Sequence, residues 1–318
     1  MTLRRPWWLL VAAFSSPWAG AQTYPLKPFR VVTAEPGGGN DFVARTIGQP
    51  IASRLGQPWV IDNRGGAGGL IAFELAARAP ADGYTLLAYA GNLWTVPLLQ
   101  PNARYDPLRD FAPITWAARS PNTLVVHPSL PVKSVAELIA FARAKPGQLS
   151  YGSGGTGAST HFAAELFKSM AKVNIVRVTY RGNGPALTDL VAGNIQVMFS
   201  PTGAATPHVK SGRLRAIAVT SAEPSPLAPG LPTIASAGLP GYESIQIYGI
   251  YAPAKTPDAI VRRLNEVIVA VLATPEVRER FLNAGVETVG STPEALAAAM
   301  KSDMARLRKL IREANIKE

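Results

Sequence analysis

The chain has 318 residues, enough for about two domains, and its 47% hydrophobic content is that of a globular protein rather than a disordered one. It has no cysteine, which excludes disulfides and thiolate chemistry, and its three histidines lie far apart, so a metal site has no support. The net charge of +11 is scattered along the chain. We interpret it as a field that favours anionic solutes or as a solvated surface, and not as a nucleic-acid interface.

The first residues are typical of a secretory signal peptide. Arg4 and Arg5 form a basic region, residues 7–14 form an apolar core, and residues 19–21 (Ala-Gly-Ala) form a small-residue cleavage site. A buried N-terminal helix is the alternative. No later stretch reaches the roughly 18 apolar residues of a membrane helix. We expect residues 1–21 to be removed after Ala21, leaving a soluble protein in the periplasm.

Expected strands and helices alternate through the first half of the chain. Caps define the helix ends: Asn40 precedes the first helix, Gly56 follows it, and Ser134 and Glu137 form a capping box for a later one. The expected strands are residues 29–33, 59–61, 84–88, 114–118 and 123–126, and the expected helices are 41–55, 70–79 and 134–144.

The second half repeats this scheme. Expected helices are 158–171, 185–191 and most of 257–318, with breaks at 274–275 and 291–293, and expected strands are 175–179, 195–199, 214–219 and 244–251. A proline-rich stretch occupies residues 224–240. The alternation predicts an α/β fold whose mostly parallel sheets are flanked by helices.

Two lobes are a better interpretation than one large sheet. The chain would cross between them near residues 119–124 and again in the proline-rich stretch. Residues 22–122 and 228–318 would form a discontinuous lobe 1, and residues 123–227 would form lobe 2. In such folds ligands bind in the cleft, at the carboxyl ends of strands.

Two glycine-rich loops each join an expected strand to an expected helix. The first is residues 36–41 (Pro-Gly-Gly-Gly-Asn-Asp), and the second is residues 152–161 (Gly-Ser-Gly-Gly-Thr-Gly-Ala-Ser-Thr-His). Free backbone N–H groups and the helix dipole make such junctions suited to carboxylate or phosphate. Because the loops lie in separate α/β segments, they predict an anion held between two lobes.

Nucleotide cofactors are not expected. Gly152, Gly154 and Gly157 match the dinucleotide fingerprint, but residues 173–178 lack the acidic residue that would bind the ribose. Nicotinamide cofactors are also not expected outside the cytoplasm. The G-K-[ST] sequence of a Walker phosphate loop does not occur.

Ser153, Ser159 and His161 raise the alternative of an exported serine hydrolase. The G-x-S-x-G nucleophile elbow is absent, so we interpret His161 as a residue that holds the loop or the ligand. Asp41 either stabilises the helix dipole or acts at the site by holding the loop or through water. The strand-to-helix junction at residues 180–185 is a further candidate cleft element.

Ordered stretches through the chain carry a family resemblance. They are 24–29 (Tyr-Pro-Leu-Lys-Pro-Phe), 36–41, 55–58, 63–69, 81–86 (Ala-Asp-Gly-Tyr-Thr-Leu), 105–107, 110–111, 161–167 (His-Phe-Ala-Ala-Glu-Leu-Phe), 184–190 (Gly-Pro-Ala-Leu-Thr-Asp-Leu), 214–220 and 238–243. On these stretches the chain resembles the Bug-type solute receptors of tripartite tricarboxylate transporters over essentially its whole mature length.

The resemblance implies a periplasmic receptor with a two-lobed, type II-like periplasmic-binding-protein fold. It would be no enzyme and would capture a small carboxylate without a cofactor or metal, for delivery to the membrane permease subunits. The loops would hold the carboxylate, partly through water. We expect a monomer, and we add Asn92 and Arg181 as candidate cleft residues. The residues that the resemblance implies are Gly37, Gly38, Gly39, Asn40, Asp41, Ser153, Gly155, Thr156, Gly157 and His161.

Departures from the family pattern leave the ligand open. Glu35 stands beside the first loop, where it would repel a carboxylate unless it points away, and Trp94 could favour a bulkier or aromatic acid. Gln196 and Ser200 stand where acids are common. Di- and tricarboxylates, amino acids and aromatic acids all remain open, and a sensor that docks on a signalling protein is an alternative to a transport receptor.

Overall fold

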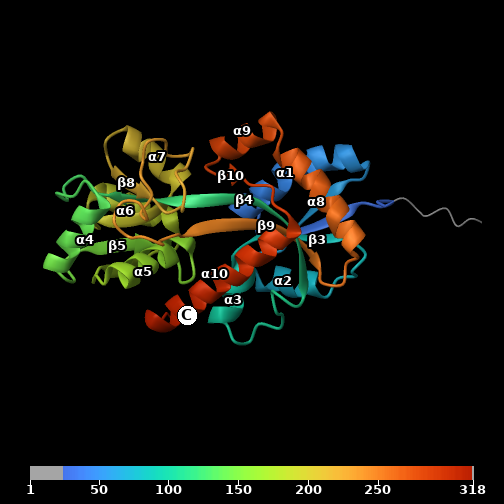
Figure 1. The fold of residues 1–318 in the computed structure, drawn as a ribbon, viewed down its shortest axis with the longest axis horizontal. Coiled ribbons are helices and arrows are strands. Elements are labelled where there is room, and N and C mark those ends of the chain that lie inside the picture. The colour runs from blue at the N-terminus through green and yellow to red at the C-terminus, as the bar shows by residue number, and fades with distance from the viewer. Residues whose placement is uncertain (1–23, 317–318) are drawn as a thin grey trace, which may run out of the picture.

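The computed structural model describes residues 24–316 of the chain, in which helices surround one continuous, strongly twisted sheet (Figure 1). The signal-peptide prediction lies outside these residues. No helix within them is both long and apolar enough to cross a membrane.

The sheet has ten strands, eight of them in the order β2-β1-β3-β9-β4-β7-β5-β6, while β8 and β10 pair with β4. Their bounds are β1 Phe29–Thr33, β2 Trp59–Asn63, β3 Thr85–Ala90, β4 Phe111–Val126, β5 Ser150–Ser153, β6 Val176–Thr179, β7 Val197–Pro201, β8 Arg215–Val219, β9 Ile245–Pro253 and β10 Glu287–Thr288.

The sheet falls into two halves. The first sheet half contains β1, β2 and β3 with the adjoining part of β9, and the second contains β5, β6, β7 and β8. The pairs β1–β2, β1–β3, β5–β6 and β5–β7 are parallel, as the strand–helix alternation predicts, so the α/β class is confirmed. The strands between them are antiparallel to their neighbours: β9 pairs in this way with β3 and β4, and β4 with β7 and β8.

One strand replaces two that the sequence predicted. The expected strands 114–118 and 123–126 are parts of β4, which runs through both sheet halves as the light green ribbon of Figure 1. Pro121, which stands between the two expected strands, lies inside β4 opposite Ile245 of β9. Irregularities elsewhere in this pairing, between Pro113 and Thr115 and between Trp116 and Ala118, adjust the long strand to the twist of the sheet.

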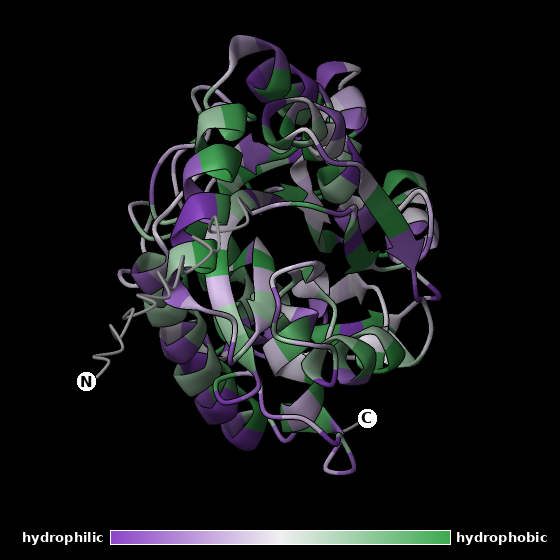
Figure 2. Cartoon of the chain, turned by 90° about the vertical axis from the view of Figure 1, so that its right-hand side faces the viewer, coloured by the Kyte–Doolittle hydropathy of each residue, from purple (hydrophilic) through white to green (hydrophobic). Residues whose placement is uncertain are grey.

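Helices cover both faces of each half. Their bounds are α1 Gly39–Leu55, the short 3-10 helix η1 Ala67–Gly69, α2 Leu70–Ala77, α3 Asn92–Leu99, α4 Val135–Ala144, α5 Ser159–Ala171, α6 Asn183–Ala192, α7 Thr202–Lys210, α8 Asp258–Leu272, α9 Pro275–Asn283 and α10 Pro293–Glu313. Helices α3 and α7 were not predicted from the sequence, and each contains an internal proline, Pro97 and Pro207. Hydrophobic and hydrophilic residues alternate along the surrounding helices (Figure 2).

The core follows the alternation of side chains along the strands. In the first half, Val31 packs in a cluster with residues of α1 and α8, while Val32 packs on the other face with residues of α2 and α10. In the second half, Leu124 and Val125 divide in the same way between two further clusters. Both faces of each half are therefore buried, as expected for a sheet with helices on either side.

Residues just after the predicted second crossing pack with the second sheet half rather than with the first. Ile234, Leu239 and Tyr242 all belong to the core cluster of the second half, although residues 228–318 were assigned to lobe 1. The Tyr242 hydroxyl also donates to the Ala163 carbonyl of α5, at 2.8 Å. We therefore propose that the sheet halves are the two lobes and that the chain returns to lobe 1 at about residue 244, where β9 begins.

Candidate functional site

The first glycine-rich loop is fixed from within by a buried carboxylate. Gly37 adopts φ +81°, a left-handed conformation that favours glycine. Asp41, in the first turn of α1, accepts from the Gly37 N–H at 2.9 Å, and it also accepts from Arg45 and from the Asn63 amide. Gly37 N–H is thus already bonded, and Asp41 holds the loop, while its contact with a ligand stays a prediction.

The bonds to Asp41 determine its charge state. Burial raises the pKa of this carboxyl, but hydrogen bonds from Arg45, Asn63 and Gly37 outweigh burial and bring the pKa below the usual 3.8. Asp41 is therefore ionised at neutral pH. Only 5% of its side chain is exposed. Its charge is therefore compensated inside the loop by the hydrogen bonds from Gly37, Arg45 and Asn63.

Glu35 points away from the first loop. Its Oε1 accepts from the Gly66 N–H at 2.8 Å, in the glycine-rich segment that precedes α2. Gly65 gives the side chain room, because a Cβ there would lie 2.3 Å from Glu35 Cγ. The negative charge of Glu35 therefore points toward residues 65–66, so it does not repel a carboxylate at the first loop in the way the sequence suggested. Arg64, another residue of that segment, pairs with Asp62 at 2.8 Å.

An arginine of β6 anchors the second glycine-rich loop. Arg177 Nε donates to the Ser153 hydroxyl at 3.0 Å, and its Nη2 donates to the Gly154 carbonyl at 3.2 Å. Ser153 is fully buried and its own hydroxyl donates to the Gly154 carbonyl at 3.0 Å. Ser153 thus supports the backbone of the loop, and its hydroxyl bonds to an arginine and a carbonyl rather than to a histidine base.

His161 closes the same loop on itself. Its Nδ1 accepts from the Gly157 N–H at 3.3 Å, and only 2% of the residue is exposed. Burial lowers the pKa of His161 to about 4, and the nearby charge of Arg177 acts in the same direction. The imidazole is therefore neutral at pH 7 and serves as an acceptor for the loop.

A large cavity of about 400 Å³ lies between the two sheet halves. From the first half it is walled by the first glycine-rich loop, and from the second half by the start of α7. The floor comes from β4 and β9, and the turn after α9 closes one side. The lining residues are Gly37, Gly38, Gly39, Phe42, Ser120, Pro201, Gly203, Ala204, Tyr248, Ala284, Gly285 and Val286.

None of these lining residues carries a charged side chain. Neither α1 nor α7 has a side-chain cap at its start. Within the described residues, no protein acceptor bonds the N–H groups of Gly38 and Gly39 at the start of α1, or of Gly203 and Ala204 in α7. Such groups, with the partial positive charge of two helix starts, are suited to anionic oxygens.

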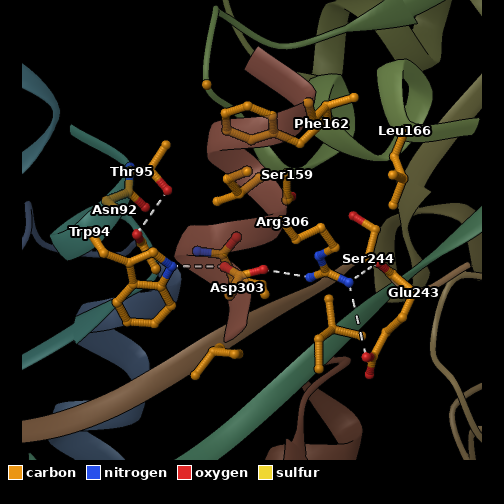
Figure 3. A pocket seen from close by; sticks show the side chains of 17 residues that line it. Asn92, Trp94, Thr95, Ser159, Phe162, Leu166, Glu243, Ser244, Asp303 and Arg306 are labelled. Atoms are coloured by element: carbon orange, nitrogen blue, oxygen red, sulfur yellow. Dashed lines mark hydrogen bonds and ion pairs between the residues drawn. The ribbon is translucent and has the colours of Figure 1, made fainter. Parts of the chain in front are cut away.

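A small cavity of about 40 Å³ lies on the other side of β9, where α3, α5 and α10 meet (Figure 3). Residues of its lining form a polar network. Trp94 Nε1 donates to Asp303 Oδ2 at 2.7 Å, and Arg306 donates to Asp303 Oδ1 and to the Glu243 carbonyl. The network joins α3 and α10 to the segment that precedes β9.

The structure distributes the predicted site residues between these two places. Gly37, Gly38 and Gly39 line the large cavity, whereas Asn92 and Gly157 line the small one. The other predicted residues line neither: Asn40, Asp41, Ser153, Gly155, Thr156, His161 and Arg181. The two glycine-rich loops therefore do not share one cavity in this structure, and their joint action on a ligand stays a prediction.

The residues that depart from the family pattern have structural partners. Trp94 is fully buried and bonded to Asp303, so its ring belongs to the core of the first half. Gln196 Oε1 accepts from the Ser150 N–H at 3.0 Å. Ser200 is fully buried and its hydroxyl donates to the Pro201 carbonyl at 3.4 Å.

Sequence reasoning missed the start of α7 and the Tyr248 side chain. The stretch 195–203 does carry the same signal as the two predicted loops, since an apolar strand runs into a proline, a threonine and a glycine. Gly203 and the later Pro207 hid the helix that follows, because neither residue favours a helix interior. Tyr248 carries no local signal, since only tertiary pairing brings β9 beside residues 37–39.

Comparison with known proteins places the chain in a family. Residues 43–316 match the TctC family, described as "Tripartite tricarboxylate transporter family receptor". A protein encoded in the tcbD-tcbE intergenic region of Pseudomonas sp. strain P51 is 40% identical over 292 residues, which cover 91% of this chain and 87% of that protein.

Solved structures agree with this assignment. Rpa4515 of R. palustris with adipate is 38% identical, with 92% of this chain and 99% of that one covered and a TM-score of 0.77. The periplasmic binding protein BugD is 32% identical, with coverage of 92% and 99% and a TM-score of 0.73. MatC from Rhodopseudomonas palustris with bound malate is 30% identical, with coverage of 91% and 100% and a TM-score of 0.73. The resemblance to Bug-type receptors is thus confirmed, and the chain belongs to the tripartite tricarboxylate transporter receptor family.

Proposed function

We propose that this receptor binds a small aliphatic dicarboxylate in the large cavity between the sheet halves. The observation that carries the proposal is the composition of the cavity wall: it includes residues at two helix starts whose backbone N–H groups have no acceptor within the described residues, and no lining side chain is charged. Backbone donors satisfy an anion without a buried counter-ion. Because the donors come from opposite sheet halves, a diacid can be held at both ends.

The related structures support this ligand class. Rpa4515 is described with adipate and MatC with malate, and both compounds are dicarboxylates. A diacid that touches both sheet halves would stabilise their closed arrangement, since a ligand shifts a conformational equilibrium by its differential affinity for the two states. We further propose that the mature protein is a periplasmic monomer that delivers this ligand to permease subunits.

The test is thermal denaturation and calorimetry of residues 22–318 with succinate, malate, glutarate and adipate, and with 1,6-hexanediol as an uncharged control. We expect at least one diacid to raise the melting temperature and the diol to leave it unchanged, because a ligand that binds only the folded state stabilises it by about 2.7 kcal/mol at 100 times its Kd. The absence of any shift at millimolar diacid would contradict the proposal.

A pair of glycine variants locates the site. Gly38→Val should fold, because a Cβ there meets only the Glu35 carbonyl at 3.7 Å, but its side chain would narrow the approach to the loop backbone. Gly184→Val is the matched control. Gly184 belongs to the junction 180–185 that the sequence made a candidate cleft element, but it lies in α6 and lines neither the large nor the small cavity, and a Cβ there meets nothing within 4 Å. We expect diacid binding to be lost only in Gly38→Val. Equal affinity in the two variants would place the ligand elsewhere.

A further inference from the structure

The Tyr248 side chain lies at the boundary between the two sheet halves. It belongs to β9, whose backbone is paired at this residue with Ala90 of β3 on one side and with Ala118 of β4 on the other. A residue in the middle of a sheet is held more accurately than one in a loop. The phenol therefore reaches the large cavity from a rigid support.

The Tyr248 hydroxyl lies directly against the first glycine-rich loop. A Cβ built at Gly39 would lie 2.6 Å from the Tyr248 hydroxyl oxygen and 3.2 Å from Cζ. Any other residue at position 39 would displace the ring, so glycine is required here for a close approach and not for an unusual φ. The hydroxyl thus stands beside the backbone of Gly39, in the first turn of α1.

This hydroxyl has no hydrogen-bond partner within the described residues. The Tyr251 hydroxyl, three positions later on β9, also lacks a partner but is fully buried. The Tyr248 hydroxyl is not among the fully buried atoms. The Tyr248 hydroxyl is therefore accessible, and the space it faces is the large cavity that its ring lines. Burial raises the pKa of Tyr248 to about 12, so the group is a neutral O–H donor at pH 7.

An O–H donor without a protein partner, set beside the first turn of α1, is complementary to an oxygen anion. Hydrogen bonds to charged groups stabilise by about 1.5–3 kcal/mol, more than bonds between neutral groups. We propose that Tyr248 is a ligand-binding residue whose hydroxyl donates to one carboxylate of the bound diacid, while its ring forms the wall along the carbon chain. This inference rests on the dicarboxylate function proposed above.

The test compares Tyr248→Phe with Tyr251→Phe by calorimetry, using the diacid that binds wild type most tightly. Both variants remove a hydroxyl that has no protein partner and keep the ring, but only Tyr248 lines the cavity. We expect Tyr248→Phe to weaken binding about 10- to 100-fold and Tyr251→Phe to leave the affinity unchanged. The melting temperatures of the ligand-free variants show that both have folded.

The outcomes separate this inference from the function on which it rests. If wild type binds no diacid, the proposed function fails. If wild type binds and Tyr248→Phe binds equally tightly, the hydroxyl does not contact the ligand and the inference is overturned while the function stands. Equal losses in both phenylalanine variants would also overturn it, because Tyr251 lies in the core away from the cavity.

Discussion

Gly203 and Gly285 bring the two sheet halves into backbone contact. Gly203 lies in the first turn of α7 in the second half, and Gly285 follows α9 in the first half. A Cβ built at Gly285 would lie 2.9 Å from Gly203 Cα, and one built at Gly203 would lie 3.2 Å from Gly285 Cα. Both residues also line the large cavity, so their contact forms part of its edge.

Because of this contact, we expect even an alanine at position 203 to destabilise the fold. Gly203→Ala should lower the free energy of unfolding by about 1–3 kcal/mol, because its methyl group meets backbone atoms that cannot rotate away. It should also weaken diacid binding, since separating the two glycines widens the cavity edge. Urea denaturation and calorimetry measure the two effects.

Gly184→Ala is the control for this substitution. Gly184 is also in the first turn of a helix, α6, and has open space around it. Helix propensity alone favours alanine over glycine by about 1 kcal/mol, so this control should be neutral or stabilising. If Gly203→Ala were equally stable, the backbone contact would not constrain the two halves.

Asp41 predicts an acid-sensitive loop. Its pKa lies below 3.8 in the folded protein, so the stabilisation from this carboxylate is present above the unfolded pKa and is lost as the pH falls through the folded value. Asp41→Asn should therefore be less stable than wild type at pH 7, and the difference should shrink as the pH falls from about 4 toward 2. A difference that stays constant over this range would show that the charge does not hold the loop.

The fold was largely predictable because its signals are local. Residues 29–33 run into glycines and a helix within a few positions, and Ser134 does accept from the Glu137 N–H as the capping box requires. The Asn40 cap was wrong, because α1 begins at Gly39, its N-cap is Gly38, and no side chain caps it. The loops were also located from local signals. The cavity was not, since its walls depend on pairs such as Gly39 with Tyr248 and Gly203 with Gly285, which only tertiary packing brings together.

The small cavity shows the same limit. Trp94 and Asp303 are 209 positions apart, so nothing near Trp94 in the sequence reveals that its indole N–H is bonded in the core. Local reasoning therefore treated the ring as a possible ligand contact. Pairing of β4 with β9 likewise gave one continuous strand where the sequence predicted two, 114–118 and 123–126. Long-range pairing decided each of these points.

The bond between Trp94 and Asp303 predicts a stability effect. Asp303→Ala leaves the buried indole N–H without its acceptor and Arg306 without its carboxylate, which should lower the free energy of unfolding by about 2–3 kcal/mol. Asp303→Asn keeps an acceptor oxygen and should lose less. Urea denaturation measures both variants.

An ion pair elsewhere on α10 provides the control for Asp303. Glu313 and Lys309 approach to 3.9 Å with both side chains largely exposed, so Glu313→Ala should change stability by less than about 1 kcal/mol. If Asp303→Ala had an equally small effect, the network drawn in Figure 3 would not hold α10 against α3.

His161 predicts a second pH dependence, in a range separate from that of Asp41. Its pKa is about 4 in the folded protein against 6.5 for a free histidine, so its neutral form stabilises the fold above pH 6.5, and this stabilisation is lost as the pH falls toward 4. The stability of wild type relative to His161→Gln should therefore fall by up to about 3 kcal/mol between these values. Denaturant melts at half-unit pH steps measure this difference. A flat difference would mean that His161 titrates alike in the folded and unfolded chain, so that the fold does not favour its neutral form.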